Sequence, residues 1–117
     1  MSENIKKFPK YGEIWLACFD PSRGSEQGGT RPALIIQNDI GNEYSSVTIV
    51  SAITTNLYKN PVTVLVDKKD SGLLKESAIK LNQIFTMDKE RLIKKLGRLS
   101  EEKIMEVKRA ISVSLNF

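Results

Sequence analysis

The residues best suited to chemistry lie in one short stretch, where a polar loop with paired glycines runs into an arginine. It reads Ser25-Glu26-Gln27-Gly28-Gly29-Thr30-Arg31-Pro32. The two glycines lack a Cβ, so the backbone can adopt positive φ and approach a ligand closely. The guanidinium of Arg31 is planar, permanently charged and rich in donors, which suits a phosphate better than lysine does. The stretch is therefore typical of a phosphate-binding site.

Several other chemistries are excluded by composition. The chain has no histidine and one cysteine, Cys18, which removes the common zinc sites, Ser-His-Asp triads and Cys-His pairs. Its Asp and Glu residues do not form a cluster typical of a metal site. Neither the Gly-x-x-x-x-Gly-Lys pattern nor the Gly-x-Gly-x-x-Gly pattern of phosphate-binding loops is present. Arginine, hydroxyls and backbone amides remain. They suit a substrate that carries its own nucleophile, such as RNA with its 2′-hydroxyl, and we expect no metal or cofactor.

The elements around this stretch are predicted to be strands. Pro32 restricts Arg31 to extended geometry, and the apolar run 33–36 follows, so Arg31 should lie at the mouth of a strand. Thr54 comes directly after another predicted strand, 47–53. Further strands are predicted at 14–19, 62–66, 77–85 and 93–99. Polar, glycine-containing segments at 38–42 and 68–75 indicate turns, and Asp88 indicates the cap of a short helical turn.

A C-terminal helix follows Ser100, which is suited to cap it. Ile104, Val107, Ile111 and Leu115 recur at helical spacing and predict one buried face. Short consecutive strands closed by a helix indicate a mainly β, single-domain fold: a small, strongly twisted antiparallel barrel or sheet with a C-terminal helix packed against it.

Length and charge fit one soluble domain. The 117 residues, 40% of them hydrophobic, can bury one core. We expect residues 1–10 to be a flexible arm and residues 11–117 to be the folded domain. No stretch is long enough to span a membrane and no signal sequence is evident, which favours a cytoplasmic protein without a membrane partner. The net charge is +4 and the basic excess lies within residues 67–117, so a polyanionic partner is permitted.

Four ordered motifs resemble the MazF/PemK family of toxin endoribonucleases. They are Tyr11-Gly12-Glu13-Ile14-Trp15 and the segments 24–32, 35–42 and 49–54, and the similarity continues through 83–92 to the C-terminal helix. The resemblance implies an SH3-like (CcdB/PemK-type) barrel that forms a homodimer. It also implies a type II toxin that cuts single-stranded mRNA at a short sequence without a metal. The family's products carry a 2′,3′-cyclic phosphate and a 5′-hydroxyl, and cleavage arrests translation and growth.

The resemblance also implies partners and site residues. The partners are a MazE-like antitoxin with a disordered acidic segment, and DNA only indirectly, through the antitoxin complex at its operator. Arg31 matches the family's catalytic arginine and Thr54 its catalytic threonine; for Arg31 an electrostatic role and a proton-transfer role both stay open. The RNA-binding residues expected from the match and from the residue types are Ser25, Glu26, Gln27, Gly28, Gly29, Pro32, Asn38, Ser51, Asn82, Gln83 and Phe85.

Phe85 marks a departure from the family pattern. Family members often read Leu-Glu-Gln-Ile-Arg-Thr, where this chain has Leu81-Asn82-Gln83-Ile84-Phe85-Thr86. Because aromatic rings stack on unpaired bases, the change bears on the cleavage sequence. Trp15 and Phe19 lie in an apolar run and are interpreted as core residues.

Other interpretations stay open at the level of sequence. Arg31 could form a structural ion pair with Glu26 or Asp39, and Thr54 could cap a turn. A toxin of the same fold could poison DNA gyrase by protein contact, as CcdB does. A basic barrel could also bind nucleic acid without cutting it.

Overall fold

The structure, a computed structural model, describes residues 8–19 and 29–116. Within these residues, six strands and three α-helices follow one another, with one 3₁₀ turn. The strands are β1 (Glu13–Cys18), β2 (Thr30–Ile35), β3 (Val47–Thr54), β4 (Thr63–Val66), β5 (Ser77–Asp88) and β6 (Leu92–Arg98). The helices are α1 (Asp39–Tyr44), α2 (Lys68–Ser71) and α3 (Glu101–Leu115), and the 3₁₀ turn is η1 (Lys89–Arg91).

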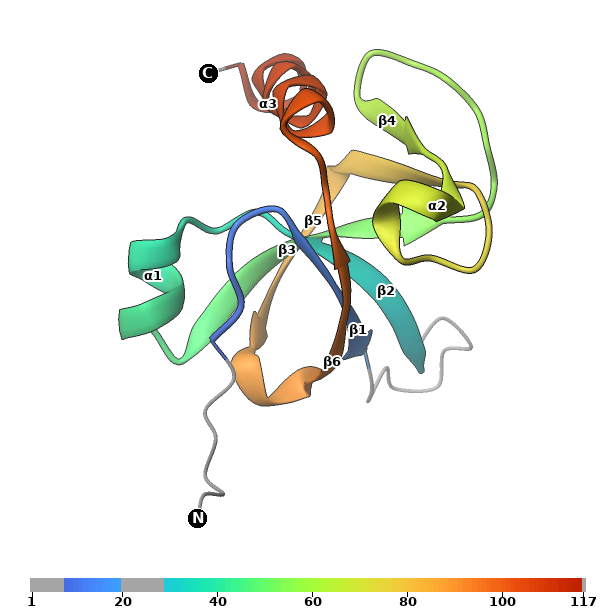
Figure 1. The fold of residues 1–117 in the computed structure, drawn as a ribbon. Coiled ribbons are helices and arrows are strands. Elements are labelled where there is room, and N and C mark those ends of the chain that lie inside the picture. Colours follow the sequence, from blue (N-terminus) through green and yellow to red (C-terminus); the bar gives the residue numbers. More distant parts are fainter. Residues whose placement is uncertain (1–7, 20–28, 117) are drawn as a thin grey trace.

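All six strands form one antiparallel sheet in the order β4-β5-β3-β2-β1-β6. The sheet is strongly curved, and α3 packs at one end of it against β4 and β5 (Figure 1). β4 and β6 are its two edges, so the barrel-like sheet is open between them. The predicted mainly β domain with a C-terminal helix is confirmed.

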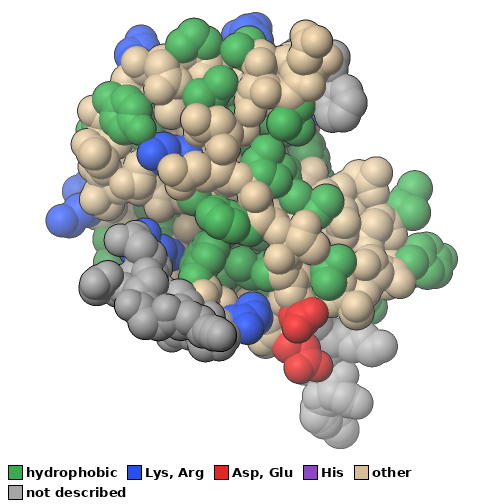
Figure 2. Space-filling view, turned by 180° about the vertical axis from the view of Figure 1, so that it is seen from behind, with side chains coloured by type: hydrophobic (Ala, Val, Ile, Leu, Met, Phe, Trp, Pro, Cys, Tyr) green, Lys and Arg blue, Asp and Glu red, His purple; other side chains and the backbone are tan. Residues whose placement is uncertain are grey.

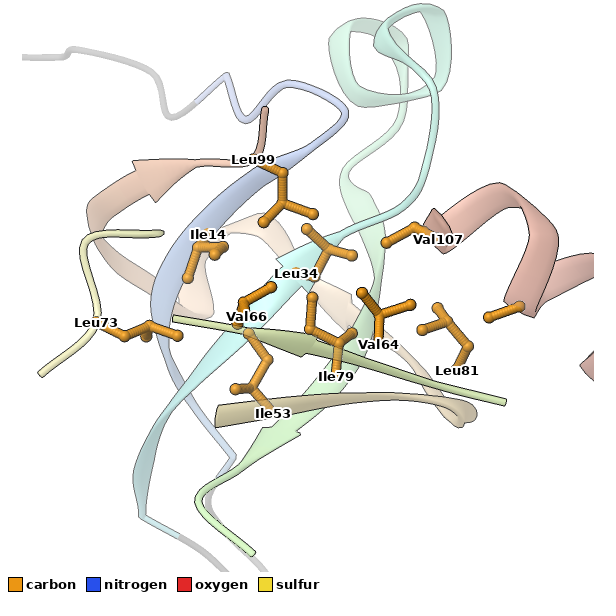
Figure 3. Packing of buried hydrophobic residues seen from close by; sticks show 11 residues of the cluster. Ile14, Leu34, Ile53, Val64, Val66, Leu73, Ile79, Leu81, Leu99 and Val107 are labelled. Carbon is orange, nitrogen blue, oxygen red and sulfur yellow. The ribbon is translucent and has the colours of Figure 1, made fainter. Parts of the chain in front are cut away.

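Strand alternation divides the core into two clusters. In β2, Leu34 faces one cluster, while its neighbours Ala33 and Ile35 face the other, as the period of two requires. The first cluster lies between the sheet and α3, where side chains from five strands converge with Val107 of the helix (Figure 3). The second cluster is smaller and lies on the other face of the strands, where Ala33 and Ile35 of β2 contribute to it.

Helix α3 begins as its sequence predicts. The hydroxyl of Ser100 accepts a hydrogen bond from the Lys103 backbone N–H at 3.2 Å, which caps the first turn. Val107 and Ala110 are buried, and Ile104 and Ile111 pack beside them. Leu115 was expected on this face but is 48% exposed in the last turn, whereas Ala110, which was not predicted to be buried, is part of the buried face.

Two predicted turns contain helices. Residues 39–44 form α1, because Asn38 accepts a hydrogen bond from the Gly41 N–H at 2.8 Å and so caps a helix. The same residue types favour turns and helix caps. Asn42 of α1 is buried, and its side-chain oxygen accepts hydrogen bonds from Gln37 Nε2 and Thr48 Oγ1. Residues 68–71, inside the second predicted turn, form the short helix α2.

The end of the predicted N-terminal arm is packed. Residues 1–7 lie outside the described residues, but Pro9 is buried and the Lys10 carbonyl accepts a hydrogen bond from the Glu13 N–H at 3.0 Å. Pro9 is therefore buried in the domain, between Phe8 and Lys10, which are exposed.

Glu13 is a buried carboxylate, 6% exposed, with three donors around it. Its Oε1 accepts hydrogen bonds from the Lys10 N–H and from Trp15 Nε1, both at 2.9 Å, and Lys95 Nζ lies 3.1 Å from Oε2. Burial alone would raise the pKa of Glu13, but these donors outweigh it and lower the pKa below its ordinary value. The ionised form therefore stabilises the folded state.

We expect Glu13→Gln to lower the free energy of unfolding by about 1–3 kcal/mol at neutral pH, because an amide cannot satisfy all three donors. Since the folded pKa is lowered, the wild-type advantage is fully present above the unfolded pKa of about 4.3 and is lost as pH falls through the folded pKa. Urea unfolding of both proteins at about pH 7 and below about pH 4 measures this. A difference that does not shrink in acid would contradict the assignment.

Candidate functional site

Arg31 lies where the sequence predicts, as the second residue of β2, with an exposed side chain. The strand entrance is tied to β1, since the Phe19 N–H donates to the Gly29 carbonyl at 2.8 Å and Cys18 pairs with Thr30. Gly29 has a φ of 96°, and no atom lies within 4 Å of the position its Cβ would take. Glycine is therefore required there for backbone conformation and not for space.

The sheet register brings Arg31 and Thr54 to the same end of the paired strands β2 and β3. β2 and β3 pair Ala33 with Ala52 and Leu34 with Ser51. Continued by two residues, this register aligns Arg31 with Thr54, the last residue of β3. Opposed residues of an antiparallel pair share a face of the sheet. The two predicted catalytic residues are thus neighbours by topology, although 22 positions separate them in the sequence.

Thr54 is half-buried, and a local turn holds its hydroxyl. Its Oγ1 accepts a hydrogen bond from the Asn56 backbone N–H at 3.1 Å. The predicted turn-capping role is therefore present. It does not use the hydroxyl proton, which can be donated to a ligand.

A bulge in β5 forms the opposite wall. The β3–β5 register jumps from the pair Ser51–Ile84 to the pair Ala52–Lys80, which leaves residues 81–83 as extra residues on β5. Leu81 is buried in the core, whereas Asn82 and Gln83 are exposed. Bulges re-aim side chains and are frequent beside active sites.

These elements enclose a hollow of about 290 Å³. Phe19 and Phe85 meet edge to face in it, with ring centroids 5.6 Å apart and an angle of 80° between the rings. Most of the wall is apolar, with one guanidinium and one side-chain amide, so it can hold a planar ring beside a phosphate. The hollow is lined by Phe19, Arg31, Pro32, Ala52, Ile53, Gln83 and Phe85.

Phe19 lines this hollow, although the sequence predicted only a core position for it. It packs partly against the second core cluster, as predicted, but it also lines the hollow. Its position directly before the polar loop is the signal that could have identified it. Phe85 is 41% exposed and lines the same hollow.

Two of the predicted RNA-binding residues lie away from the hollow. Asn38 follows the opposite end of β2 from Arg31, and its side chain caps α1. Ser51 is fully buried, and its hydroxyl donates to the Lys80 carbonyl at 2.5 Å. Both side chains have structural roles here that neighbouring sequence did not reveal. Ser25, Glu26, Gln27 and Gly28 lie outside the described residues.

The surface chemistry agrees with an anionic ligand. Seen from behind the view of Figure 1, hydrophobic side chains gather in the middle of the face, and lysine and arginine lie above, to the left of and below them (Figure 2). Acidic side chains show in one small area only. Among residues 8–19 and 29–116, no group of three or more Cys, Asp or Glu side chains could hold a metal ion. In those same residues no helix has the length and hydropathy needed to cross a membrane.

Comparison with known proteins gives matches over most of the chain. The family model described as PemK-like, MazF-like toxin of type II toxin-antitoxin system matches residues 10–115. A curated protein named Endoribonuclease MazF, from Staphylococcus epidermidis, is 52% identical over 106 residues, which cover 89% of this chain and 88% of that protein.

Solved structures resemble the fold at lower sequence identity. An endoribonuclease from a mycobacterial species has a TM-score of 0.80 at 19% identity, covering 96% of this chain and 95% of that one. MazF from Deinococcus radiodurans has a TM-score of 0.76 at 22% identity, covering 94% and 98%. A MazE-MazF structure from the same organism has a TM-score of 0.78 at 20% identity, covering 94% and 98%. At these identities the likeness supports the fold alone.

Proposed function

The chain belongs to the PemK-like, MazF-like toxins of type II toxin-antitoxin systems, and we propose that its active centre is the end of the sheet that carries Arg31 and Thr54. It is an endoribonuclease of this family. The single observation that carries the proposal is the β2–β3 register, which, continued by two residues, aligns Thr54 with Arg31, and Arg31 lines the hollow. Both side chains can donate hydrogen bonds to a phosphate there.

The reaction proposed is attack by the RNA's own 2′-oxygen on the adjacent phosphorus. A bond forms between the 2′-oxygen and phosphorus, the bond from phosphorus to the 5′-oxygen breaks, and the 2′-hydroxyl proton is lost while the 5′-oxygen gains one. The products are a 2′,3′-cyclic phosphate and a 5′-hydroxyl. Negative charge grows on the phosphate oxygens during this step, so fixed donors aimed at them stabilise the transition state.

Arg31 supplies positive charge to that transition state, and Thr54 supplies a hydrogen bond from a hydroxyl held by the Asn56 turn. Because the nucleophile belongs to the substrate, the proposal needs no metal or cofactor. Gln83 and Phe85 line the hollow, and Pro32 forms part of its wall. We assign RNA contacts to these residues, to Gly29 and Asn82 beside them, and to the preceding loop with Ser25, Glu26, Gln27 and Gly28. Direct RNA contact through Asn38 or Ser51 is not part of the proposal.

The partners proposed follow from family and charge. Crystal structures of MazE-MazF from Deinococcus radiodurans are among the solved structures that share the fold of this chain. We infer a MazE-like antitoxin with an acidic segment for this chain, since the net charge of +4 favours an acidic partner. A homodimer, action on single-stranded mRNA in the cytoplasm, and contact with DNA only through the antitoxin complex complete the proposal.

Thr54→Val tests the threonine directly. We expect cleavage under single-turnover conditions to slow by about 10²–10³-fold, because valine keeps the shape but removes the donor. Thr54→Ser keeps a hydroxyl and is expected to stay within about tenfold of wild type. Thr55→Val is the matched control, since this exposed neighbour follows the end of β3 and is not the residue that the register aligns with Arg31. Equal rates for Thr54→Val and Thr55→Val would contradict the role of Thr54.

A further inference from the structure

A second hollow adjoins the first on the other side of the aromatic pair. It has a volume of about 360 Å³, and Phe19 and Phe85 form part of the wall of both hollows. The pair therefore stands between them as a ridge. The second hollow also contains Thr86, Asp88 and Arg91, none of which the proposed chemistry uses.

Arg91 gives the second hollow its positive charge. It comes from η1, the turn between β5 and β6, and is half-buried. Its Nη1 donates to the Cys18 carbonyl at 3.3 Å, which holds the guanidinium against the end of β1. A guanidinium carries five donor hydrogens, and this contact uses one. The others are of the right geometry for a phosphate.

The remaining wall is suited to a base. The ring of Phe85 is 41% exposed, so an unpaired base can stack on it. Thr86 and Asp88 are exposed and line the same hollow with hydroxyl and carboxylate oxygens. Asp88 makes no side-chain capping hydrogen bond to η1. Oxygen acceptors select bases that present an amino group, as carboxylates do with cytosine.

Each hollow thus has one arginine, and the two hollows share one aromatic ridge. Successive nucleotides of a single strand alternate a charged phosphate with a planar base, and this arrangement matches that repeat. We propose that the second hollow is a nucleotide subsite next to the cleavage centre, where Arg91 holds a phosphate, Phe85 stacks on the base, and Thr86 and Asp88 favour an amino-bearing base. The inference rests on the proposed function, because it takes the Arg31 hollow as the cleavage centre.

The test has a cleavage arm and a binding arm. In the cleavage arm, RNAs with randomised bases around a mapped cut are digested by wild type, Asp88→Asn and Phe85→Leu. We expect wild type to disfavour uracil at one position next to the cut, and Asp88→Asn to reduce that discrimination by about tenfold. Phe85→Leu is expected to weaken selection of every base at that same position, since stacking is shared by all bases.

In the binding arm, an oligonucleotide with 2′-deoxyribose at the cut is titrated by fluorescence anisotropy, so no cleavage is needed. Arg91→Gln should weaken binding by about tenfold and lower the salt dependence by about one phosphate contact. Arg98→Gln, an exposed arginine at the far end of β6, is the charge-matched control. Thermal unfolding of each variant confirms that it is folded.

The results of the two arms distinguish a failure of the second subsite from a failure of the proposed cleavage activity. Unchanged base preference in Asp88→Asn and Phe85→Leu, together with equal affinity for Arg91→Gln and Arg98→Gln, would overturn the second subsite even if the RNA is cut normally. If the RNA is not cut but binding depends on Arg91 and not on Arg98, the cleavage proposal fails and the second subsite stands.

Discussion

Arg31→Ala is expected to abolish discrete cuts in a long single-stranded RNA, with the cleavage rate lowered by about 10²–10³-fold or more. Arg31 is the only charged side chain that lines the hollow of β2, β3 and β5 among the described residues. In the proposed mechanism, its removal takes away both the positive charge and the planar set of N–H donors that would face the transition-state phosphate. Arg31→Lys keeps the positive charge but lacks the planar set of N–H donors of a guanidinium, so we expect a cleavage rate between those of Arg31→Ala and wild type.

The readout is primer extension of new 5′ ends after incubation in EDTA. Arg98→Gln serves again as the control, because Arg98 pairs with Glu13 at the opposite end of β1 from the Ala17–Arg31 pair, and this variant should cut at the wild-type sites. RNA left intact by folded wild-type protein would argue against a metal-independent ribonuclease. Cuts of equal intensity from Arg31→Ala and wild type would show that the active centre lies elsewhere.

Gly97→Ala is expected to destabilise the fold by about 3 kcal/mol or more, the range of severe overpacking. In β6, Gly97 lies against the end of α2: a Cβ added to it would fall 2.2 Å from the Ser71 carbonyl oxygen. Gly72 makes the reciprocal contact, since its Cβ would fall 2.0 Å from the Leu96 carbonyl oxygen. Backbone atoms cannot move aside as a flexible side chain can, so the two segments must separate.

Gly29→Ala is the matched comparison for Gly97→Ala. Gly29 has open space around its missing Cβ but a φ of 96°, so alanine costs only backbone strain, about 1–2 kcal/mol. Urea unfolding of both variants measures the difference. An unfolding midpoint for Gly97→Ala as high as that of Gly29→Ala would contradict the close approach of β6 and α2.

Much of the scaffold follows from local pattern. The β-branched run in β3 and the apolar run after Pro32 predict their strands because each is a property of a few adjacent residues. The capping side chain of Ser100 likewise predicts where α3 begins. The same reasoning placed Arg31 at a strand entrance. The resemblance to a toxin family, carried by four ordered motifs, is confirmed by the family match and by the 52% identical relative.

The rest depends on contacts between distant segments. The bulge at residues 81–83 exists only in the pairing of β5 with β3, so no local pattern in β5 reveals which side chains it turns outward. The sequence suggests that the Ser51 hydroxyl is available to a ligand, but pairing of β3 with β5 buries it, and it donates a hydrogen bond to the Lys80 carbonyl. Asn38 is of a type common in turns, and only the structure shows that its side chain accepts a hydrogen bond from the Gly41 backbone N–H and caps α1. Arg91 gave no signal at all, since its place beside Cys18 is a contact across 73 positions.

In the proposed mechanism, the RNA's own 2′-hydroxyl attacks phosphorus at the site of Arg31 and Thr54. The most direct test is a pair of oligonucleotides that differ only at the mapped cut, one with ribose and one with 2′-deoxyribose on the 5′ side of the scissile phosphate. We expect only the ribose substrate to be cut, in EDTA, with a 2′,3′-cyclic phosphate on the upstream product. Cleavage of the 2′-deoxy substrate at the same bond would mean that water attacks instead, and would contradict the account.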